Sequence, residues 1–139
     1  MNEQQATPAR APQASGFTLM EMMIVMALIV ILAGIGMTVY GTSVQRSKEA
    51  VLKEDLFRMR DAIDQYYADK NKYPGSLEDL VSEKYMRAVP QDPFTQSTET
   101  WQTTMSDPDP GNPSQQSGIS NVKSGSEQTG LDGSRYADW

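Results

Sequence analysis

The sequence predicts an α+β protein: one long N-terminal helix, apolar in its first half, and a small C-terminal head with a short helix, a small antiparallel β-sheet and a long loop. Three observations predict this fold class. The apolar residues are concentrated in one long run near the N-terminus. An amphipathic pattern with helical spacing follows that run. Prolines and glycines then divide the rest of the chain into short segments.

The composition excludes several kinds of function. The chain has 139 residues, 12 Lys and Arg against 18 Asp and Glu, a formal net charge of -6, no Cys and no His. Thiol nucleophiles, His-based catalytic triads and zinc sites with Cys or His ligands are therefore absent. The acidic balance also argues against binding of nucleic acid through bulk positive charge.

Residues 17–39 form the apolar run, FTLMEMMIVMALIVILAGIGMTV, and its only charge is Glu21. As a helix, this run extends about 34 Å, which exceeds the roughly 30 Å of a bilayer core. The run is longer than the apolar stretch of a secretory signal peptide. A plain signal anchor would have the same hydropathy, so the run alone predicts a membrane span without identifying a function.

Glu21 is the feature that indicates a function, because a carboxylate within an apolar span costs about 2.5–3.5 kcal/mol on insertion scales. It is the fifth residue counted from Phe17, which directly follows Gly16. Cleavage between Gly16 and Phe17 would create a charged α-amine, a natural partner for a carboxylate at low dielectric. The two groups would lie about 6 Å apart along one helix axis. This separation favours pairing between neighbouring subunits displaced along a filament.

The second half of the long helix is predicted from an apolar stripe with spacings of four and three residues. The stripe consists of Leu52, Leu56, Met59, Ile63 and Tyr66. Polar residues fill the other face, so we expect the stripe to pack in a core. Asn71 and the Tyr-Pro-Gly sequence at 73–75 end the helix near Lys70.

After the long helix the chain forms a short helix, for which Ser76 is the predicted N-cap and Asp79 an imperfect capping-box partner. We expect this helix to end near Tyr85. Prolines at 90 and 93 exclude helix beyond it.

Two strands are predicted after the short helix. Residues 98–105 alternate in polarity, which predicts a strand with Trp101, Thr103 and Met105 on one buried face. Residues 119–123 are a second, shorter strand. Between them, residues 106–118 carry three prolines and predict an exposed loop. Leu131 is the one large aliphatic residue of the following segment, and we expect it in the core.

The sequence from Gly16 to Glu21, Gly-Phe-Thr-Leu-Met-Glu, resembles the cleavage and methylation motif of type IV pilins and type II secretion pseudopilins. The resemblance implies that a prepilin peptidase removes a leader, residues 1–16, by cleavage after Gly16. It further implies N-methylation of Phe17 and a role of Glu21 in assembly, through pairing with the Phe17 amine of an adjacent subunit. Residues 17–41 would be the transmembrane and assembly half of the helix, and residues 42–139 the periplasmic head with the amphipathic half-helix.

The sequence departs from this family at one position of the span. Members often have a proline at the twenty-second residue of the mature chain, where this sequence has Thr38. Gly34, Gly36 and Gly41 surround Thr38, and each weakens a helix by about 1 kcal/mol relative to Ala. These glycines are candidates for the soft segment that the proline would otherwise supply.

The segment after the long helix resembles the same region of the major, G-type pseudopilins, from Tyr73-Pro74 to the Pro-x-Asp-Pro-Phe sequence at 90–94. This resemblance implies a subunit of a type II secretion pseudopilus that polymerises with its own kind and drives protein secretion. It implies a single-pass protein of the bacterial inner membrane with its head in the periplasm. The implied partners are the prepilin peptidase, the inner-membrane secretion platform and minor pseudopilins, and nucleic acid is not among them.

Two other functions remain open at this point. A type IV pilin for adhesion or motility would use the same leader and helix, although the small head and the lack of a cysteine pair around a C-terminal loop argue against it. A membrane-anchored, carboxylate-based hydrolase is disfavoured because no pair of carboxylates lies in a recognisable catalytic motif. We therefore expect no enzymatic activity.

The C-terminal segment, residues 124–139, resembles the calcium-binding loop of major pseudopilins, because oxygen-bearing side chains lie among glycines. Calcium takes six to eight oxygen ligands and tolerates irregular loops. The resemblance makes Glu127 and Asp132 the candidate acidic ligands, with backbone carbonyls completing the shell. The spacing is shorter than in the family, and Glu replaces Asp. The alternative is a solvated loop that Tyr136 and Trp139 close by packing on the core.

Overall fold

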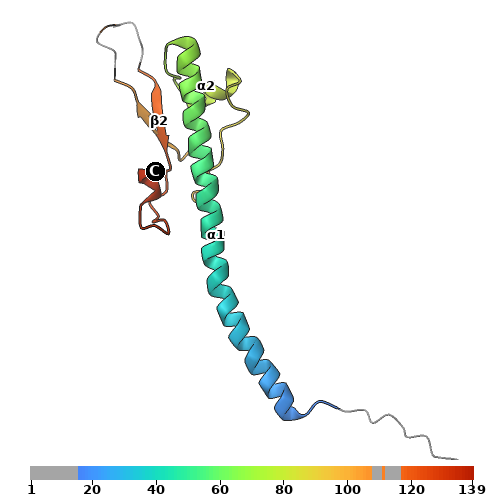
Figure 1. The fold of residues 1–139 in the computed structure, drawn as a ribbon. Helices are drawn as coiled ribbons and strands as arrows, with labels where there is room; N and C mark the ends of the chain where they lie inside the picture. Colours follow the sequence, from blue (N-terminus) through green and yellow to red (C-terminus); the bar gives the residue numbers. More distant parts are fainter. Residues whose placement is uncertain (1–15, 108–110, 112–116) are drawn as a thin grey trace, which may run out of the picture. The chain divides into compact units, whose positions relative to one another are not determined.

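The computed structural model describes residues 16–107, 111 and 117–139. In chain order the elements are α1 (Leu19–Lys70), α2 (Leu77–Ser82), β1 (Gln102–Met105), β2 (Ile119–Lys123) and the 3-10 helix η1 (Tyr136–Asp138) (Figure 1). The predicted α+β architecture is confirmed. The described residues form two compact units, one up to Val39 and one from Tyr40 to Trp139, and we call the second unit the head. The predicted leader lies outside the described residues, except for Gly16.

Helix α1 begins two residues later than predicted and ends where predicted. The hydroxyl of Thr18 caps its first turn by accepting a hydrogen bond from the Glu21 amide at 3.1 Å. The Thr18 side chain thus gives a partner to a backbone N–H of the first turn, which has no acceptor within the helix. At the other end, Asn71 adopts the left-handed conformation with φ of 51°, which terminates the helix after Lys70.

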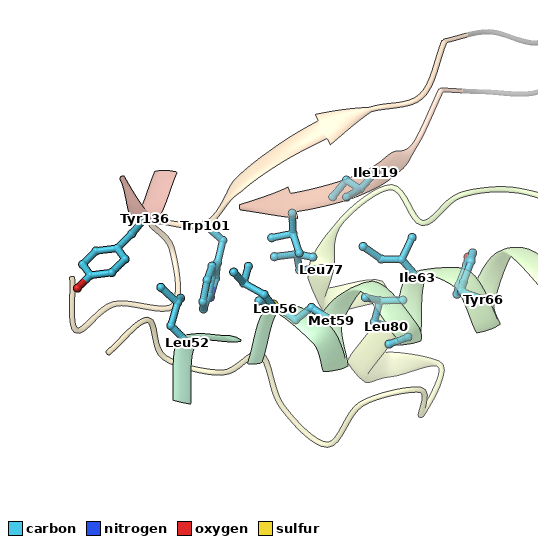
Figure 2. Close-up of a cluster of buried hydrophobic side chains, with 12 residues drawn as sticks. Leu52, Leu56, Met59, Ile63, Tyr66, Leu77, Leu80, Trp101, Ile119 and Tyr136 are labelled. Atoms are coloured by element: carbon cyan, nitrogen blue, oxygen red, sulfur yellow. The ribbon is translucent and has the colours of Figure 1, made fainter. Parts of the chain in front are cut away.

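The predicted apolar stripe is confirmed, because all five of its side chains are buried. Figure 2 shows them in one cluster with side chains from the later parts of the head, although β1 contributes none. Those partners are Leu77 and Leu80 of α2, Trp101 before β1, Ile119 and Val122 of β2, and Tyr136 of η1. The amphipathic half of α1 therefore forms one wall of the head's core.

Helix α2 has the predicted N-cap but is shorter than predicted. Ser76 and Asp79 form a complete capping box, in which each side chain accepts a hydrogen bond from the other residue's backbone amide. The helix ends at Ser82 instead of near Tyr85, because Lys84 is left-handed with φ of 66°. The amide of Tyr85 then donates to the carbonyl of Leu80, so the chain turns back at this point.

The sheet is a two-stranded antiparallel ribbon with a bulge between Thr104 and Met105. Strand β2 has the predicted bounds. The prediction for the first strand was wrong in two respects: β1 begins at Gln102, and all of its residues are exposed, including Met105 at 55%. The physical reason is that β2, through Ile119 and Val122, provides the buried side of the ribbon, so alternation along β1 does not place a face in the core.

Two further expectations concern the chain around this ribbon. Leu131 is 44% exposed, so its predicted place in the core was wrong. It lies in a tight turn in which the amide of Gly133 donates to the carbonyl of Gly130. Of the predicted exposed loop at 106–118, residues 108–110 and 112–116 lie outside the described residues. Asp107, Gly111 and Ser117 are exposed as predicted, whereas Ser106 is half-buried and Gly118 is buried.

Candidate functional site

The N-terminal candidate site lies where α1 begins. Phe17 precedes the helix and is 76% exposed. Glu21 is the third residue of α1, and its side chain is also exposed. A carboxylate in the first turn interacts favourably with the positive end of the helix dipole. Among the described residues, no cation forms an ion pair with Glu21. Its carboxylate is thus presented outward, where a group of another molecule can reach it.

The apolar half of α1 exposes its large side chains on every side. They include Leu28 at 54%, Leu32 at 68% and Met37 at 78% exposure. The helix is continuous through the glycines around Thr38, whose hydroxyl donates to the carbonyl of Ile35 at 3.0 Å. By length and composition α1 can cross a membrane. An apolar surface of this extent requires lipid or other protein subunits to cover it.

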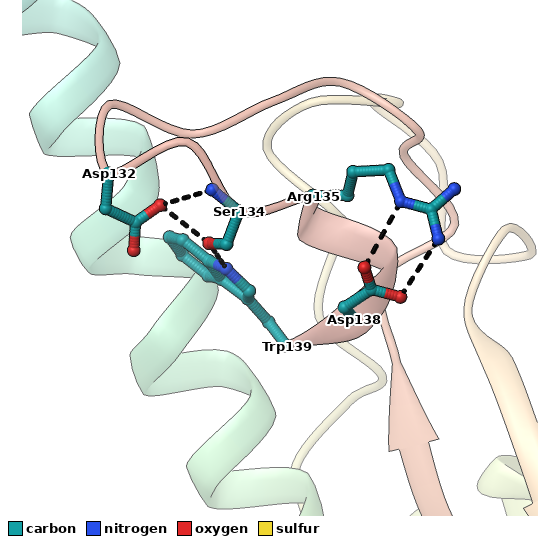
Figure 3. A network of polar contacts seen from close by, with 5 residues as sticks. All are labelled: Asp132, Ser134, Arg135, Asp138 and Trp139. Atoms are coloured by element: carbon teal, nitrogen blue, oxygen red, sulfur yellow. Dashed lines mark hydrogen bonds and ion pairs between the residues drawn. The ribbon is translucent and has the colours of Figure 1, made fainter.

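The C-terminal candidate site is formed by residues 124–139, which we call the tail. A β-bridge joins Thr129 to Arg135, and the turn between them contains Asp132 and the left-handed Gly133. The carboxylate of Asp132 accepts hydrogen bonds from the amide and the hydroxyl of Ser134, at 2.9 and 2.6 Å. Figure 3 shows that the Ser134 hydroxyl also accepts a hydrogen bond from the indole of Trp139.

These contacts also set the protonation of Asp132. The hydrogen bonds from the hydroxyl and the amide of Ser134 hold the pKa of Asp132 below its ordinary value, and the positive charge of Lys53 lowers it further. The carboxylate is therefore charged at neutral pH, and it is already paired within the tail.

The oxygens of the tail in this conformation do not fit a calcium shell. Glu127 and Asp132 are both exposed, and no cluster of three or more acidic, His or Cys side chains suited to a metal is present in the described part of the chain. The carbonyls between and beside them already accept hydrogen bonds within the head, namely those of Gln128, Thr129, Gly130 and Ser134. Calcium needs six to eight oxygens, so an ion would have to break several of these bonds. Calcium binding stays a prediction.

A set of residues on α1 that hold the tail was not predicted from the sequence. The carboxylate of Glu49 accepts hydrogen bonds from the Tyr136 hydroxyl and the Leu131 amide, both at 2.8 Å. Lys53 lies over the Trp139 ring at 4.3 Å, and Arg60 donates to the backbone oxygen of Trp139 at 2.8 Å. The residues Gln45, Glu49 and Lys53 recur every four positions, so their shared helix face was visible in the sequence.

A buried carboxylate joins the tail to the Pro-x-Asp-Pro-Phe segment. Asp92 is fully buried and accepts hydrogen bonds from the amides of Phe94, at 2.8 Å, and Thr95. Its other oxygen accepts from the hydroxyl of Ser124, which in turn accepts from the amide of Ser126. A buried carboxylate is tolerated where hydrogen bonds compensate its desolvation in this way. The role of Asp92 is therefore to position the tail.

The comparisons with known proteins agree with the features at the N-terminus. A family described as the prokaryotic N-terminal methylation motif matches residues 12–37, which include Gly16, Phe17 and Glu21. The chain is similar to the fimbrial protein EcpC of Eikenella corrodens, with 35% identity over 79 residues that cover 53% of this chain and 52% of that protein. It is also similar to the type II secretion system core protein G of Aeromonas hydrophila, with 28% identity over 96 residues that cover 58% of this chain and 67% of that protein.

These matches leave part of each protein uncompared, since the first spans only about half of the fimbrial protein. No solved structure gave a significant match. Neither relative's name describes an enzyme. The methylation motif and the long apolar helix together fit a membrane-anchored protein. In its motif, its two relatives and its α+β architecture, this chain is similar to type IV pilin-like proteins with a prepilin-type N-terminus.

Proposed function

We propose that the chain is a structural subunit of a type II secretion pseudopilus. The observation that carries the assembly part of this proposal is the N-terminal constellation: an exposed Phe17, a Glu21 carboxylate that pairs with no cation among the described residues, and an apolar half-helix whose large side chains are exposed. Cleavage after Gly16 would convert Phe17 into an N-terminal amine, which is then N-methylated. The amine of one subunit would pair with Glu21 of its neighbour while the apolar helices pack together.

The proposed pairing has a physical advantage over an unpaired carboxylate. Within an apolar filament core or a bilayer, an isolated charge is costly, and an opposite charge with good geometry offsets much of that cost. A subunit whose Glu21 has no amine beside it is therefore disfavoured. Assembly then favours the position along the filament axis at which Glu21 meets the Phe17 amine of its neighbour. The head, anchored by this helix, would lie in the periplasm, and the inner-membrane secretion platform and minor pseudopilins would be its partners.

Secretion is favoured over motility by two observations. The protein G relative matches over two thirds of its length, whereas the fimbrial relative matches over about half. The chain also has no cysteine, so it cannot close a C-terminal loop with a disulfide. The second candidate function, a type IV pilus pilin, is supported by the higher identity of the fimbrial relative. We propose no catalytic role.

Deletion of the gene in its native host distinguishes the two functions. A pseudopilin mutant should retain its surface pili and twitching motility but lose proteins from the culture supernatant, and the wild-type gene should restore them. A mutant with normal secretion but without surface pili would contradict the secretion proposal and support the pilin. Normal secretion together with normal pili would contradict both.

A further inference from the structure

Four polar side chains of α1 contact the second half of the tail, between Thr129 and Trp139: Gln45, Glu49, Lys53 and Arg60. We call this set the clamp. All four lie within the head, and their contacts join α1 to residues more than sixty positions later in the chain. They are spaced by four, four and seven residues, which places them along one face of a helix.

Arg60 makes more hydrogen bonds to later segments than any other clamp residue. Its guanidinium donates to the carbonyl of Val122 at 2.9 Å, to the side-chain oxygen of Asn121 at 2.9 Å and to the backbone oxygen of Trp139 at 2.8 Å. These acceptors belong to two different segments, β2 and the end of the tail. The five donors of a guanidinium suit such a junction, because one side chain can satisfy several carbonyls at once.

Gln45 and Glu49 hold the other side of the tail. The hydroxyl of Tyr136, which is fully buried, donates to Glu49 and accepts a hydrogen bond from Gln45 at 3.0 Å. Glu49 also accepts from the amide of Leu131, at the turn that contains Asp132. The turn is therefore fastened to α1 by a carboxylate of the helix.

Lys53 lies between these two groups and brings a positive charge to Asp132. Its ammonium group lies over the ring of Trp139, and a pocket of the surface is lined by Lys53, Arg60, Asp132 and Trp139 together. A divalent cation next to Asp132 would face the positive charges of Lys53 and Arg60. Like charges in such proximity repel, so this neighbourhood disfavours a bound cation.

We propose that the clamp, and not a metal ion, closes the tail on α1. Gln45 and Arg60 of the clamp donate to backbone oxygens of the tail, and Glu49 accepts from the amide of Leu131, so these contacts join the tail to α1 without an ion. The tail of this chain is thus held on α1 without a metal ion, and Arg60 is the principal positioning residue.

Hydrogen exchange of the full-length chain in detergent micelles, followed by mass spectrometry, tests this proposal. The direct reporter is the amide of Leu131, which donates to Glu49 of α1, and the amides of Gly130 and Tyr136, which donate within the tail, report on the tail's own fold. In the wild-type protein their exchange should be the same in millimolar calcium chloride and in chelator. Arg60→Met keeps the length of the side chain but removes its donors, and it should accelerate tail exchange roughly 10- to 100-fold.

Arg58→Met is the matched control, because Arg58 is exposed and its ion pair is with Glu54 four residues earlier, within α1. It should leave tail exchange unchanged. Should Arg60→Met prevent folding, Lys53→Met serves in its place, with acceleration in the same direction. Asp132→Asn retains an oxygen that can accept both hydrogen bonds of Ser134, so it should keep the tail protected in calcium and in chelator alike.

Two results would overturn the proposal. The first is slower tail exchange of the wild-type protein in calcium, by tenfold or more, with loss of that effect in Asp132→Asn. The second is an Arg60→Met or Lys53→Met protein whose tail exchanges no faster than that of Arg58→Met.

Discussion

Replacing Met59 by Ala is expected to destabilise the head strongly, because Met59 is fully buried in the cluster between α1 and the later elements. Truncation of a buried Met to Ala typically costs about 2–5 kcal/mol, since it removes apolar contacts and leaves a cavity. A domain of this size is stable by only about 5–15 kcal/mol. Each kcal/mol changes its melting temperature by about 4–8 °C, so even a 2 kcal/mol loss should lower it by about 8–16 °C.

Phe57→Ala is the matched control on the same helix, because Phe57 is 67% exposed and lies outside the cluster. A surface substitution of this kind should change stability by about 0.5 kcal/mol or less. The assay is thermal unfolding of the full-length chain in detergent, followed by near-UV circular dichroism of the head's aromatic side chains. Equal losses for the two variants would refute the assignment of the core to the Leu52-to-Tyr66 stripe.

Three further predictions concern processing, a close backbone approach and a helix cap. Protein extracted from the native membrane should begin with N-methyl-Phe17 by mass spectrometry of its N-terminal peptide, and a chain still beginning at Met1 in a host with an active prepilin peptidase would contradict cleavage after Gly16. Gly125→Ala should prevent the tail from docking, because a Cβ atom there would lie 2.0 Å from the carbonyl oxygen of Thr100; wild-type protection of the tail in hydrogen exchange would contradict it. Ser76→Ala should cost about 1 kcal/mol in thermal unfolding, because it removes the cap of α2, and an unchanged melting temperature would show that the cap is dispensable.

The features of this fold that depend on local sequence were predictable. The apolar stripe, the end of α1 at Lys70 and the N-cap at Ser76 all follow from residues within one or two turns of each other. The second strand has its predicted bounds, because Ile119 and Val122 are the apolar residues of a short polar segment. Local patterns of spacing and capping are strong signals of this kind.

The features that depend on distant contacts were not predictable in the same way. Alternation along residues 98–105 gave no information on whether a second layer would cover β1, and Met105 is in fact exposed. Arg60 appeared as one of several charges on the polar face of a helix, and only the fold brings it to Val122 and Trp139. Likewise, Asp92 was recognised as part of a segment, whereas its burial and its bond to Ser124 depend on tertiary packing.

The most direct test of the proposed function is the filament yield of a Glu21→Ala variant, measured by shearing and by crosslinking in a host that processes the protein. Glu54→Ala is the control, because it removes an exposed carboxylate of the same helix in the head, outside the apolar run. The account predicts that Glu21→Ala is cleaved after Gly16 and inserted in the membrane but forms no filaments, whereas Glu54→Ala assembles normally. Filaments of Glu21→Ala at the wild-type yield would contradict the pairing of Glu21 with the Phe17 amine.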